Sequence, residues 1–518
     1  MDNQFPLPGP TPLTPQTPAT PQPSPLSPIS SPPPPPASPV PEPATPTPLP
    51  TPEEAAPPPP GYQPPAQENA PVVKSSRLKI IIPIVIGLLI LGIVAFIIIR
   101  LFASAPEEGS VAPGQPVTLT YWGLWEPIQV IKPVLDEFET QNPNIKIDYQ
   151  LQSPQDYQSR LNTALESNNP PDLVYMHSTW LPIFAGNLLP APANTISATE
   201  VQTNFYPLIS RLLVVGNQVY GIPTSAEGLG LFINTTIFQQ LGLQDPRTWE
   251  DLDSAARAIK DVDPATGRIN RAGVALGNTT NVDHWPDIVT LMLFQSGINL
   301  YDPKGEELET TLRYYTQFVT KDHVWDDTLP NSVVAFANEK VGMIFAPTWR
   351  AAEIKQINPS LAWKVVPVPQ LPDSDIITWA SIWFNGVPSG SRHPKEAWTF
   401  LKFLASAQAQ QILFESAAKE REFPQPPANK AVATIAQNNP VIAPFVQSLD
   451  TAKTFYTAGD TQDSATGLNS RLIKYLEDAV NGVGRSQNIP QTLETLNQGF
   501  KQVLTQFGIS ITPVTRSP

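Results

Sequence analysis

The pattern of apolar and polar residues becomes regular from residue 117 onward. Residues 117–121 alternate between apolar and polar, as in a half-buried strand, and residues 130–142 carry one apolar helical face. Residues 145–151 alternate again, residues 157–167 have a helical pattern, and residues 172–176 form a short apolar run. The order of strand, helix, strand, helix and strand predicts βαβ units and a largely parallel sheet.

Later segments keep this α/β character. Residues 214–220 alternate around a Gly-Asn pair typical of a hairpin, and residues 230–233 read as a strand. Thr248 and Asp251 have the spacing of a capping box and begin a helix that ends at Ile259. Further helices are predicted at residues 283–297, 310–320, 394–407, 468–480 and 492–507. A region of about 400 residues without repeats is large enough for two α/β lobes.

Upstream, residues 80–99 form an apolar run without a single charge. A helix of about 20 residues rises about 30 Å, the hydrocarbon thickness of a bilayer. Lys74, Arg77 and Lys79 precede the run, whereas Arg100 is the one basic residue directly after it. This asymmetry predicts a single-pass transmembrane helix with the N-terminus in the cytoplasm and the large domain outside.

A cleavable signal peptide is the rival interpretation of the same segment. Residues 103–105 offer an Ala-Ser-Ala site of the kind that signal peptidases recognise. The apolar run is longer than the core of a usual signal peptide, and Arg100 separates it from that site. We therefore predict an uncleaved signal anchor over residues 77–103 followed by a tether over residues 104–116, with cleavage after Ala105 as the alternative.

Composition sets the first 76 residues apart, because they hold 29 of the chain's 64 prolines. A segment so rich in proline and poor in charge cannot bury enough apolar surface to offset the entropy of ordering. Residues 1–76 are predicted to be a disordered cytoplasmic tail. It serves either as a spacer or as a docking segment for a proline-binding partner, and the sequence leaves both open.

Several kinds of chemistry are disfavoured. The chain has no cysteine, a net charge of −14 and four histidines, so thiolate chemistry is excluded and nucleic-acid binding is disfavoured. The motifs of serine hydrolases, phosphate loops and zinc proteases are missing from the sequence. Residues 261–272 resemble a calcium loop, but Ala265 and Ala272 occupy two ligand positions, which favours a hairpin turn. No catalytic residue, metal site or cofactor is predicted.

Several motifs occur together in a recognisable order. They are Tyr121–Gly123, Pro171–Val174, Ala185–Leu189, Val219–Pro223, Leu231–Asn234, Pro246–Leu252, Phe336–Trp349 and His393–Leu404. In this order and spacing the chain resembles the family 1 extracellular solute-binding proteins of ABC transporters, the group that includes maltose-binding protein. The resemblance covers nearly all of residues 117–510.

The resemblance implies a two-lobed α/β fold, the type II periplasmic-binding-protein fold, with a ligand cleft between lobes that close by a hinge. Each lobe is expected to be discontinuous. Lobe one takes residues 117–229 and 381–432, lobe two takes residues 230–380 and 433–510, and residues 511–518 form a tail. The chain is expected to cross between lobes near residues 228–234, 381–386 and 431–439.

The resemblance also suggests ligand-binding residues, because apolar sugar faces stack on aromatic rings while sugar hydroxyls need polar partners. Trp349 matches the cleft tryptophan of the family, and Glu227 matches a sugar-binding glutamate. The other candidates lie in contact loops or beside the return crossing: Trp122, Trp125, Glu126, His177, Thr179, Trp180, Asp283, His284, Trp285, Trp379 and Trp383. The acidic-basic pair usual in the first loop is absent. Trp249, Trp363 and Trp398 are assigned to core packing instead.

The predicted function is that of a membrane-anchored, extracytoplasmic component of an ABC importer. It is expected to bind an oligosaccharide and deliver it to permease subunits, without enzymatic activity of its own. Members of the family also take polyol phosphates and other small solutes, so the solute itself stays open. Two alternatives remain: a glycan-binding adhesin or sensor that signals through the proline-rich tail, and a surface glycan enzyme.

Overall fold

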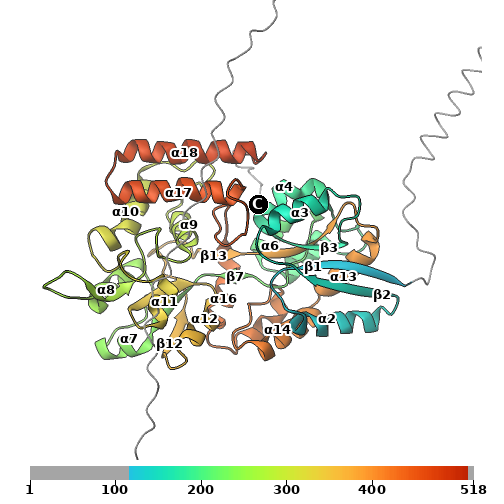
Figure 1. The fold of residues 1–518 in the computed structure, drawn as a ribbon, viewed down its shortest axis with the longest axis horizontal. Helices are drawn as coiled ribbons and strands as arrows, with labels where there is room; N and C mark the ends of the chain where they lie inside the picture. The colour runs from blue at the N-terminus through green and yellow to red at the C-terminus, as the bar shows by residue number, and fades with distance from the viewer. Residues whose placement is uncertain (1–115, 511–518) are drawn as a thin grey trace, which may run out of the picture. The chain divides into compact units, whose positions relative to one another are not determined.

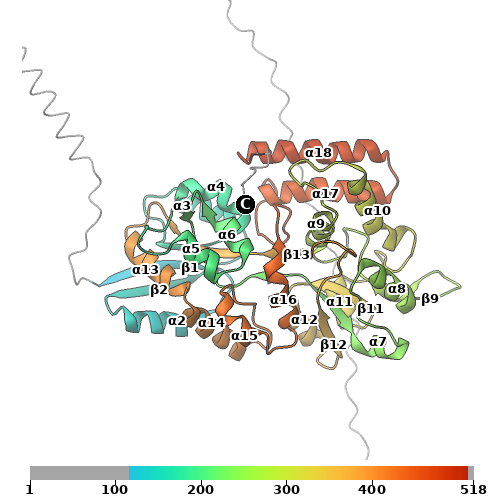
Figure 2. The same ribbon diagram turned by 180° about the vertical axis from the view of Figure 1, so that it is seen from behind.

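The computed structural model describes residues 116–510, which form two lobes (Figures 1 and 2). The predicted proline-rich tail, transmembrane segment and C-terminal tail, and nearly all of the tether, lie outside the described residues. Among residues 116–510, no helix combines the length and apolar character needed to span a bilayer.

Lobe one is built on a five-stranded sheet in the order β2-β1-β3-β14-β4. β1 pairs in parallel with β2 and β3, as predicted, whereas the returning strand β14 is antiparallel to β3 and β4. The strands are β1 (Val117–Gly123), β2 (Ile145–Leu151), β3 (Leu173–His177), β4 (Leu188–Leu189) and β14 (Trp383–Pro388). The helices of this lobe are α2 (Ile128–Gln141), α3 (Tyr157–Leu165), α4 (Leu181–Phe184), α5 (Ala198–Asn204), α6 (Pro207–Leu213), α13 (Pro394–Leu404) and α14 (Ala407–Glu420), and the short helices are η1 (Ser178–Trp180) and η2 (Ala185–Asn187).

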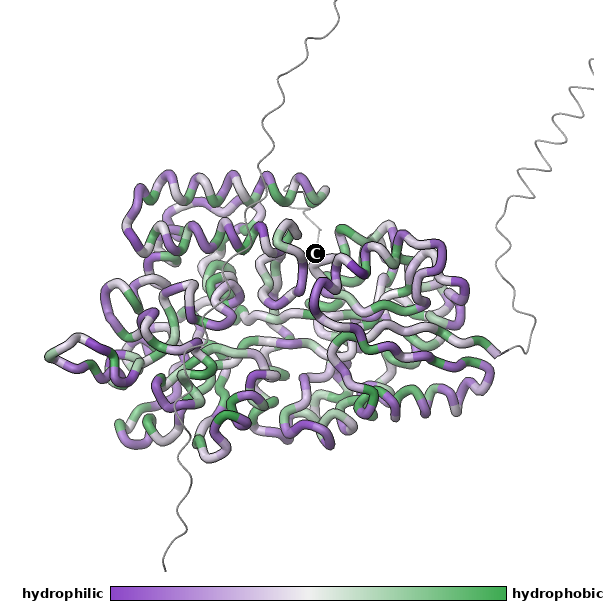
Figure 3. The backbone as a smooth tube through the Cα atoms, in the orientation of Figure 1, coloured by the Kyte–Doolittle hydropathy of each residue, from purple (hydrophilic) through white to green (hydrophobic). Residues whose placement is uncertain are grey.

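Lobe two has its own five-stranded sheet, in the order β12-β8-β11-β10-β9. Its strands are β8 (Gly230–Asn234), β9 (Asp261–Val262), β10 (Ile269–Val274), β11 (Val341–Ala346) and β12 (Trp363–Val366). Its helices are α7 (Thr235–Leu241), α8 (Trp249–Ile259), α9 (Trp285–Gln295), α10 (Glu306–Thr320), α11 (Ser332–Ala337), α12 (Arg350–Ile357), α17 (Leu468–Gly484) and α18 (Ile489–Gln506). α17 and α18 lie side by side, and hydrophobic and hydrophilic residues alternate along both, as amphipathic helices require (Figure 3).

Three short strands join the lobes in a separate sheet, β15-β13-β7. β7 (Glu227–Gly228) is antiparallel to β13 (Thr378–Ser381), which is parallel to β15 (Ala452–Lys453). At each strand the chain passes between the two hydrophobic cores: Ala226, Ala380 and Ala452 belong to the core of lobe one, and Leu229, Trp379 and Phe455 to that of lobe two. We call this sheet the hinge sheet.

The first two strands of the hinge sheet lie close to the predicted crossings, and the third lies further along the chain. The sequence predicts the third crossing near residues 431–439, but β15 begins at Ala452. The physical reason is a small separate core, in which Val432, Ala436, Ile442 and Val446 pack with Phe414 of α14. The connecting segment also contains η3 (Lys430–Val432), α15 (Ala433–Ala436), α16 (Ala443–Ser448) and η4 (Leu449–Thr451).

Several local predictions are confirmed. The capping box forms at α8, where the Thr248 hydroxyl accepts from the Asp251 N–H and the Asp251 carboxylate accepts from the Thr248 N–H. The hairpin of β5 (Val214–Val215) and β6 (Gln218–Val219) turns at Gly216 and Asn217, with φ of 57° and 68°. The calcium-like segment forms the predicted hairpin turn between β9 and β10.

The close approach of α8 to the lobe-two sheet generates a prediction. A Cβ at Gly273 of β10 would clash with the carbonyl oxygen of Ala256, a backbone atom that cannot move alone. We expect Gly273→Ala to lower the free energy of unfolding by about 1–3 kcal/mol through overpacking. Chemical denaturation measures the change, and the exposed Gly186→Ala is the matched control because its Cβ would meet nothing within 4 Å. Equal stability of the two variants would contradict this packing.

Candidate functional site

A cavity of about 330 Å³ lies between the lobes, beside the hinge sheet. Lobe one contributes an aromatic wall made of Trp125, Tyr175 and Trp383. The ring of Trp383 stacks on Tyr175 at a centroid distance of 5.7 Å and meets Trp125 edge-on at 5.4 Å. β14 places Trp383 opposite His177 of β3, which is why a residue of the returning segment lies beside residues of the first segment.

Lobe two contributes Trp349, which follows β11 and immediately precedes α12. Its side chain is 37% exposed, which is unusual for so large an apolar group. The guanidinium of Arg350 lies 4.0 Å from the ring centroid, and His284 meets the ring edge-on at 5.4 Å. Trp349 is therefore a supported aromatic surface that faces the cavity rather than a core residue.

His284 is held in one orientation at the start of α9. The Nε of Arg350 donates to His284 Nε2 at 3.0 Å, so the ring proton is assigned to Nδ1. Nδ1 lies 3.3 Å from a carboxylate oxygen of Asp460 and 3.7 Å from one of Asp287. Asp287 also accepts from the Gly459 N–H at 2.8 Å, and burial raises the pKa of its carboxyl group. This network ties the loop around Asp460 to α9.

Glu227 of β7 lines the cavity, and we call the part of the lining around Glu227 the floor of the cavity. The Thr348 hydroxyl donates to its Oε2, whereas its buried Oε1 has no hydrogen-bond partner within residues 116–510. Burial raises the pKa of Glu227 to about 7, against the opposing effects of Thr348, Arg421 and the nearby Gln425 side chain. Buried polar atoms are nearly always paired, so an unpaired oxygen facing a cavity marks a place where a bound molecule can donate a hydrogen bond.

Arg421 lies beside this floor and was not anticipated from the sequence. Its Nη2 donates to Glu126 Oε1 at 2.7 Å, while Arg421 Nε and Glu126 Oε2 are buried without partners in the described chain. A side cavity of about 20 Å³ behind Arg421 has room for a water molecule. The site thus offers a donor as well as an acceptor.

The structure brings six of the predicted site residues together in the cavity lining. These are Trp125, Glu227, His284, Trp349, Trp379 and Trp383. The other seven candidates are outside the lining: Trp122, Glu126, His177, Thr179, Trp180, Asp283 and Trp285.

These seven side chains make their contacts elsewhere in the protein. Trp180 is fully buried behind Trp383, and Trp285 packs partly buried against the lobe-two core. Asp283 accepts from the Ser332 hydroxyl and the Val333 N–H, which caps α11. Glu126 binds the guanidinium of Arg421. His177 is hydrogen-bonded to Ser381, and Thr179 to Asn469.

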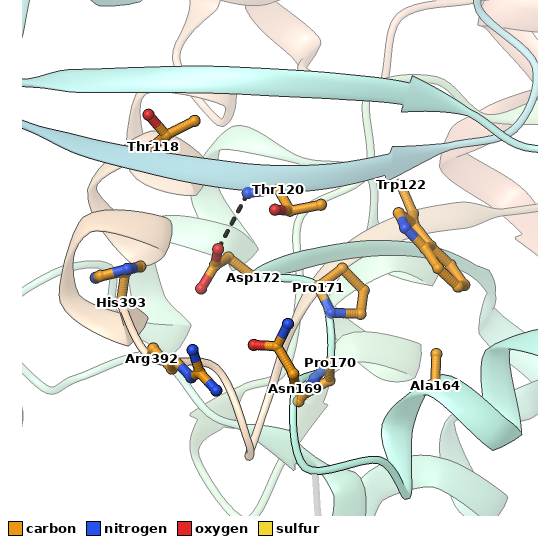
Figure 4. Close-up of a pocket in the computed structure, with 10 residues that line it drawn as sticks. All are labelled: Thr118, Thr120, Trp122, Ala164, Asn169, Pro170, Pro171, Asp172, Arg392 and His393. Atoms are coloured by element: carbon orange, nitrogen blue, oxygen red, sulfur yellow. Dashed lines mark hydrogen bonds between the residues drawn. The ribbon is translucent and has the colours of Figure 1, made fainter.

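Trp122 lies in a second cavity, of about 290 Å³, within lobe one (Figure 4). Side chains alternate between the two faces of β1, so Tyr121 enters the core whereas Trp122 is on the face with Thr118 and Thr120. Asp172 is held there by the Thr120 N–H and the Ser391 hydroxyl. Trp122 and Trp125 are therefore only three residues apart in sequence but line different cavities.

Sequence reasoning missed other lining residues, among them Tyr175, Asp287, Arg421, Gln425 and Asp460. Tyr175 could have been found, since it lies in the strand next to His177. Arg421 and Gln425 follow α14 without any local motif, and only the fold brings them to the hinge. Within residues 116–510, no group of three or more His, Asp and Glu side chains is arranged to hold a metal ion.

The ionisation of Glu227 gives a testable pH dependence. Between its ordinary pKa of 4.5 and its folded pKa of about 7, the folded chain retains a proton that the unfolded chain has lost. The free energy of unfolding therefore falls as pH rises through this range. The Glu227→Gln variant has no carboxyl group to ionise, so it does not lose stability in this way. Its free energy of unfolding, measured against that of the unchanged chain, should therefore rise by on the order of 1–3 kcal/mol between pH 4.5 and pH 8.

Denaturant titrations across this pH range measure the difference. The exposed Glu420→Gln, at the end of α14, removes the same charge and controls for net charge. If the difference in free energy of unfolding between the Glu227→Gln variant and the unchanged chain stays constant with pH, Glu227 ionises as an ordinary surface carboxylate does.

Comparisons with known proteins agree with this geometry. The family described as bacterial extracellular solute-binding protein matches residues 125–411. The Multiple sugar-binding protein of Streptococcus mutans is 24% identical over 347 residues, which cover 63% of this chain and 80% of that protein. The cyclic alpha-maltosyl-1,6-maltose binding protein of Arthrobacter globiformis has a similar structure, with a TM-score of 0.63, 17% identity, and coverage of 76% of this chain and 100% of that chain.

The sugar-binding protein MalE of Xanthomonas citri has a TM-score of 0.62 and 19% identity, covering 75% of this chain and 98% of that chain. At such identities the structures establish the fold alone, and they confirm the two-lobed architecture. The family match spans more than half of the sequence. The chain therefore belongs to the bacterial extracellular solute-binding proteins, as its sequence motifs indicated.

Proposed function

We propose that this chain is the extracytoplasmic binding component of an ABC importer and that it binds an oligosaccharide in the cavity between its lobes. The observation that carries the proposal is the aromatic lining contributed by both lobes. Trp125, Tyr175 and Trp383 come from lobe one, and Trp349 comes from lobe two. Flat aromatic surfaces match the apolar C–H faces of pyranose rings.

The polar groups of the cavity fit hydroxyl groups. Glu227 Oε1 is an acceptor without a donor, and Arg421 Nε is a donor without an acceptor, within the described residues. A hydroxyl can both donate and accept, so a sugar can serve both kinds of group. The volume of about 330 Å³ lies within the range of small-molecule sites and suits a short oligosaccharide segment.

The comparisons support the sugar assignment. The S. mutans relative is named for multiple sugars, and the A. globiformis protein is named for cyclic alpha-maltosyl-1,6-maltose. Trp125, Glu227, His284, Trp349, Trp379 and Trp383 are the contacts that we propose for this chain. The seven other predicted residues lie outside the cavity lining and are not part of the proposal: Trp122, Glu126, His177, Thr179, Trp180, Asp283 and Trp285.

In this proposal the protein performs no chemistry. Binding closes the lobes through the hinge sheet, and the closed complex passes its solute to permease subunits, while separate subunits hydrolyse ATP. Residues 80–99 anchor the chain in the membrane and place residues 116–510 outside the cytoplasm, a step that rests on the apolar run and its flanking charges. Tethering raises the effective concentration of the binding domain at the permease.

Thermal unfolding of the full-length chain in detergent tests the proposal against maltotetraose, mannotriose, diacetylchitobiose, amino acids and polyol phosphates. A sugar present at 100 times its Kd should add about 2.7 kcal/mol of stability and raise the Tm by a few degrees. Trp349→Ala should weaken that sugar about tenfold or more, because it removes an aromatic wall of the site.

The control is Leu371→Ala, since Leu371 is 36% exposed and lies outside the cavity lining. It should leave the sugar-induced shift unchanged. Stabilisation by an amino acid or a polyol phosphate in place of every sugar would overturn the oligosaccharide assignment. Equal sugar binding by the Trp349→Ala variant would overturn the assigned site.

A further inference from the structure

A buried chain of hydrogen bonds passes from lobe one to lobe two behind the cavity. It runs through His177 at the end of β3, Thr179 in η1 and Asn469 in α17. All three side chains are buried, with 0%, 2% and 0% exposure. Thr179 lies in the segment that packs in lobe one, and Asn469 lies on a helix that packs in lobe two. We call these three residues the interlobe relay.

The contacts of the relay orient the Asn469 amide and the Thr179 hydroxyl. Asn469 Nδ2 donates to the Tyr456 carbonyl at 2.9 Å, which turns Asn469 Oδ1 toward the Thr179 hydroxyl at 3.1 Å. The Thr179 hydroxyl donates to Asn469 Oδ1 and also lies 2.6 Å from His177 Nδ1. His177 Nε2 shares a hydrogen bond with the Ser381 hydroxyl at 2.7 Å.

One competing contact exists, because the Thr179 N–H also points at His177 Nδ1, from 3.3 Å. Both the N–H and the hydroxyl of Thr179 therefore contact the same ring nitrogen of His177. Burial lowers the pKa of His177 to about 3, so the ring is neutral at physiological pH and has one donor and one acceptor. The neutral ring joins Ser381 to Thr179, and Thr179 and Asn469 continue the chain of hydrogen bonds to the Tyr456 carbonyl.

Both ends of the relay reach the cavity. Ser381 lies on the hinge strand β13 and is part of the cavity lining. At the other end, Asn469 holds the Tyr456 carbonyl, and its N–H donates to the Asp463 carboxylate at 2.8 Å. The segment between Tyr456 and Asp463 contributes Gly459, Asp460 and Gln462 to the lining. The relay thus connects the two sides of the site through the protein interior.

We propose that His177, Thr179 and Asn469 are positioning residues that hold the two lobes in the arrangement in which both sides of the cavity face the solute. None of the three lines the cavity. Separating the lobes here requires breaking the Thr179–Asn469 bond, and the net free energy of that hydrogen bond opposes the separation. The relay therefore favours the closed arrangement and raises affinity without touching the ligand.

The first test measures the lobes directly and needs no ligand. The chain has no cysteine, so Lys132→Cys in α2 and Lys304→Cys in lobe two supply one label pair, at side chains that are 60% and 70% exposed. Spin-label distances are recorded on the full-length chain in detergent. Thr179→Val, which keeps the shape and removes the hydroxyl, should shift the distribution toward longer separations, whereas Thr179→Ser should restore the original distribution.

Thr316→Val is the matched control, because this buried threonine loses only hydrogen bonds to the carbonyls of Leu312 and Arg313 within α10. A Thr179→Val distribution identical to that of the control would overturn the inference. If Thr179→Val does not fold, Asn469→Leu breaks the same bond from the other lobe. It should give the same lengthening, and an unchanged distribution would again overturn the proposal.

The second test measures affinity and rests on the proposed function. The probe is whichever of maltotetraose, mannotriose and diacetylchitobiose the unchanged chain binds. Thr179→Val should raise its Kd about five- to tenfold, the equivalent of one neutral hydrogen bond, and Thr179→Ser should stay near the original value. Equal Kd values for Thr179→Val and the control would count against the relay. Failure of the unchanged chain to bind any sugar would instead overturn the oligosaccharide assignment, and the distance measurement would still decide the relay.

Discussion

The joint between the two lobes is the constraint on which the rest of the structure depends. Two hydrophobic cores meet at a sheet whose strands β7, β13 and β15 have two, four and two residues. Glu227, Trp379 and Ser381 belong to these strands and also line the cavity. The hinge and the binding site are therefore one structure, so any change in the angle between the lobes also changes the geometry of the site.

This joint explains why polar groups are left incompletely paired at the floor of the site. Glu227 Oε1, Arg421 Nε and Glu126 Oε2 are buried without partners in the described part of the chain. Such atoms lower stability, and folded proteins usually pair them. These three atoms belong to residues beside the hinge, as expected for a site where a solute or a bound water completes the pairing.

The aromatic and polar parts of the site are supported in different ways. Trp383 is held by rings from its own lobe, Tyr175 and Trp180 among them, which is a packing arrangement. Trp349 is held by Arg350 and His284, and His284 is in turn fixed by acidic groups from α9 and the loop at Asp460. The two walls can therefore respond differently to closure, since the lobe-two wall depends on a loop that the interlobe relay also fixes.

The sequence by itself determined the local structure and the family. β2 has the predicted bounds, α8 begins at the predicted capping box, and the Gly-Asn pair makes the predicted hairpin, because each depends on residues a few positions apart. Of the three tryptophans assigned to core packing, Trp249 and Trp398 are buried and Trp363 packs partly buried against the lobe-two core. The order of the motifs was not needed for these assignments, but it was needed to recognise the two-lobed fold.

The tertiary structure alone decided which candidate residues share the cavity. Trp122 and Trp125 are only three residues apart in sequence, yet the alternation of side chains along β1 places Trp122 in another cavity. His177 and Thr179 follow the predicted contact strand but are buried in bonds to Ser381 and Asn469, more than 200 positions away. Arg421 reaches the floor because α14 ends beside the hinge. Periodicity and spacing report contacts within one element, whereas a cavity between lobes is made by chain segments that only folding brings together.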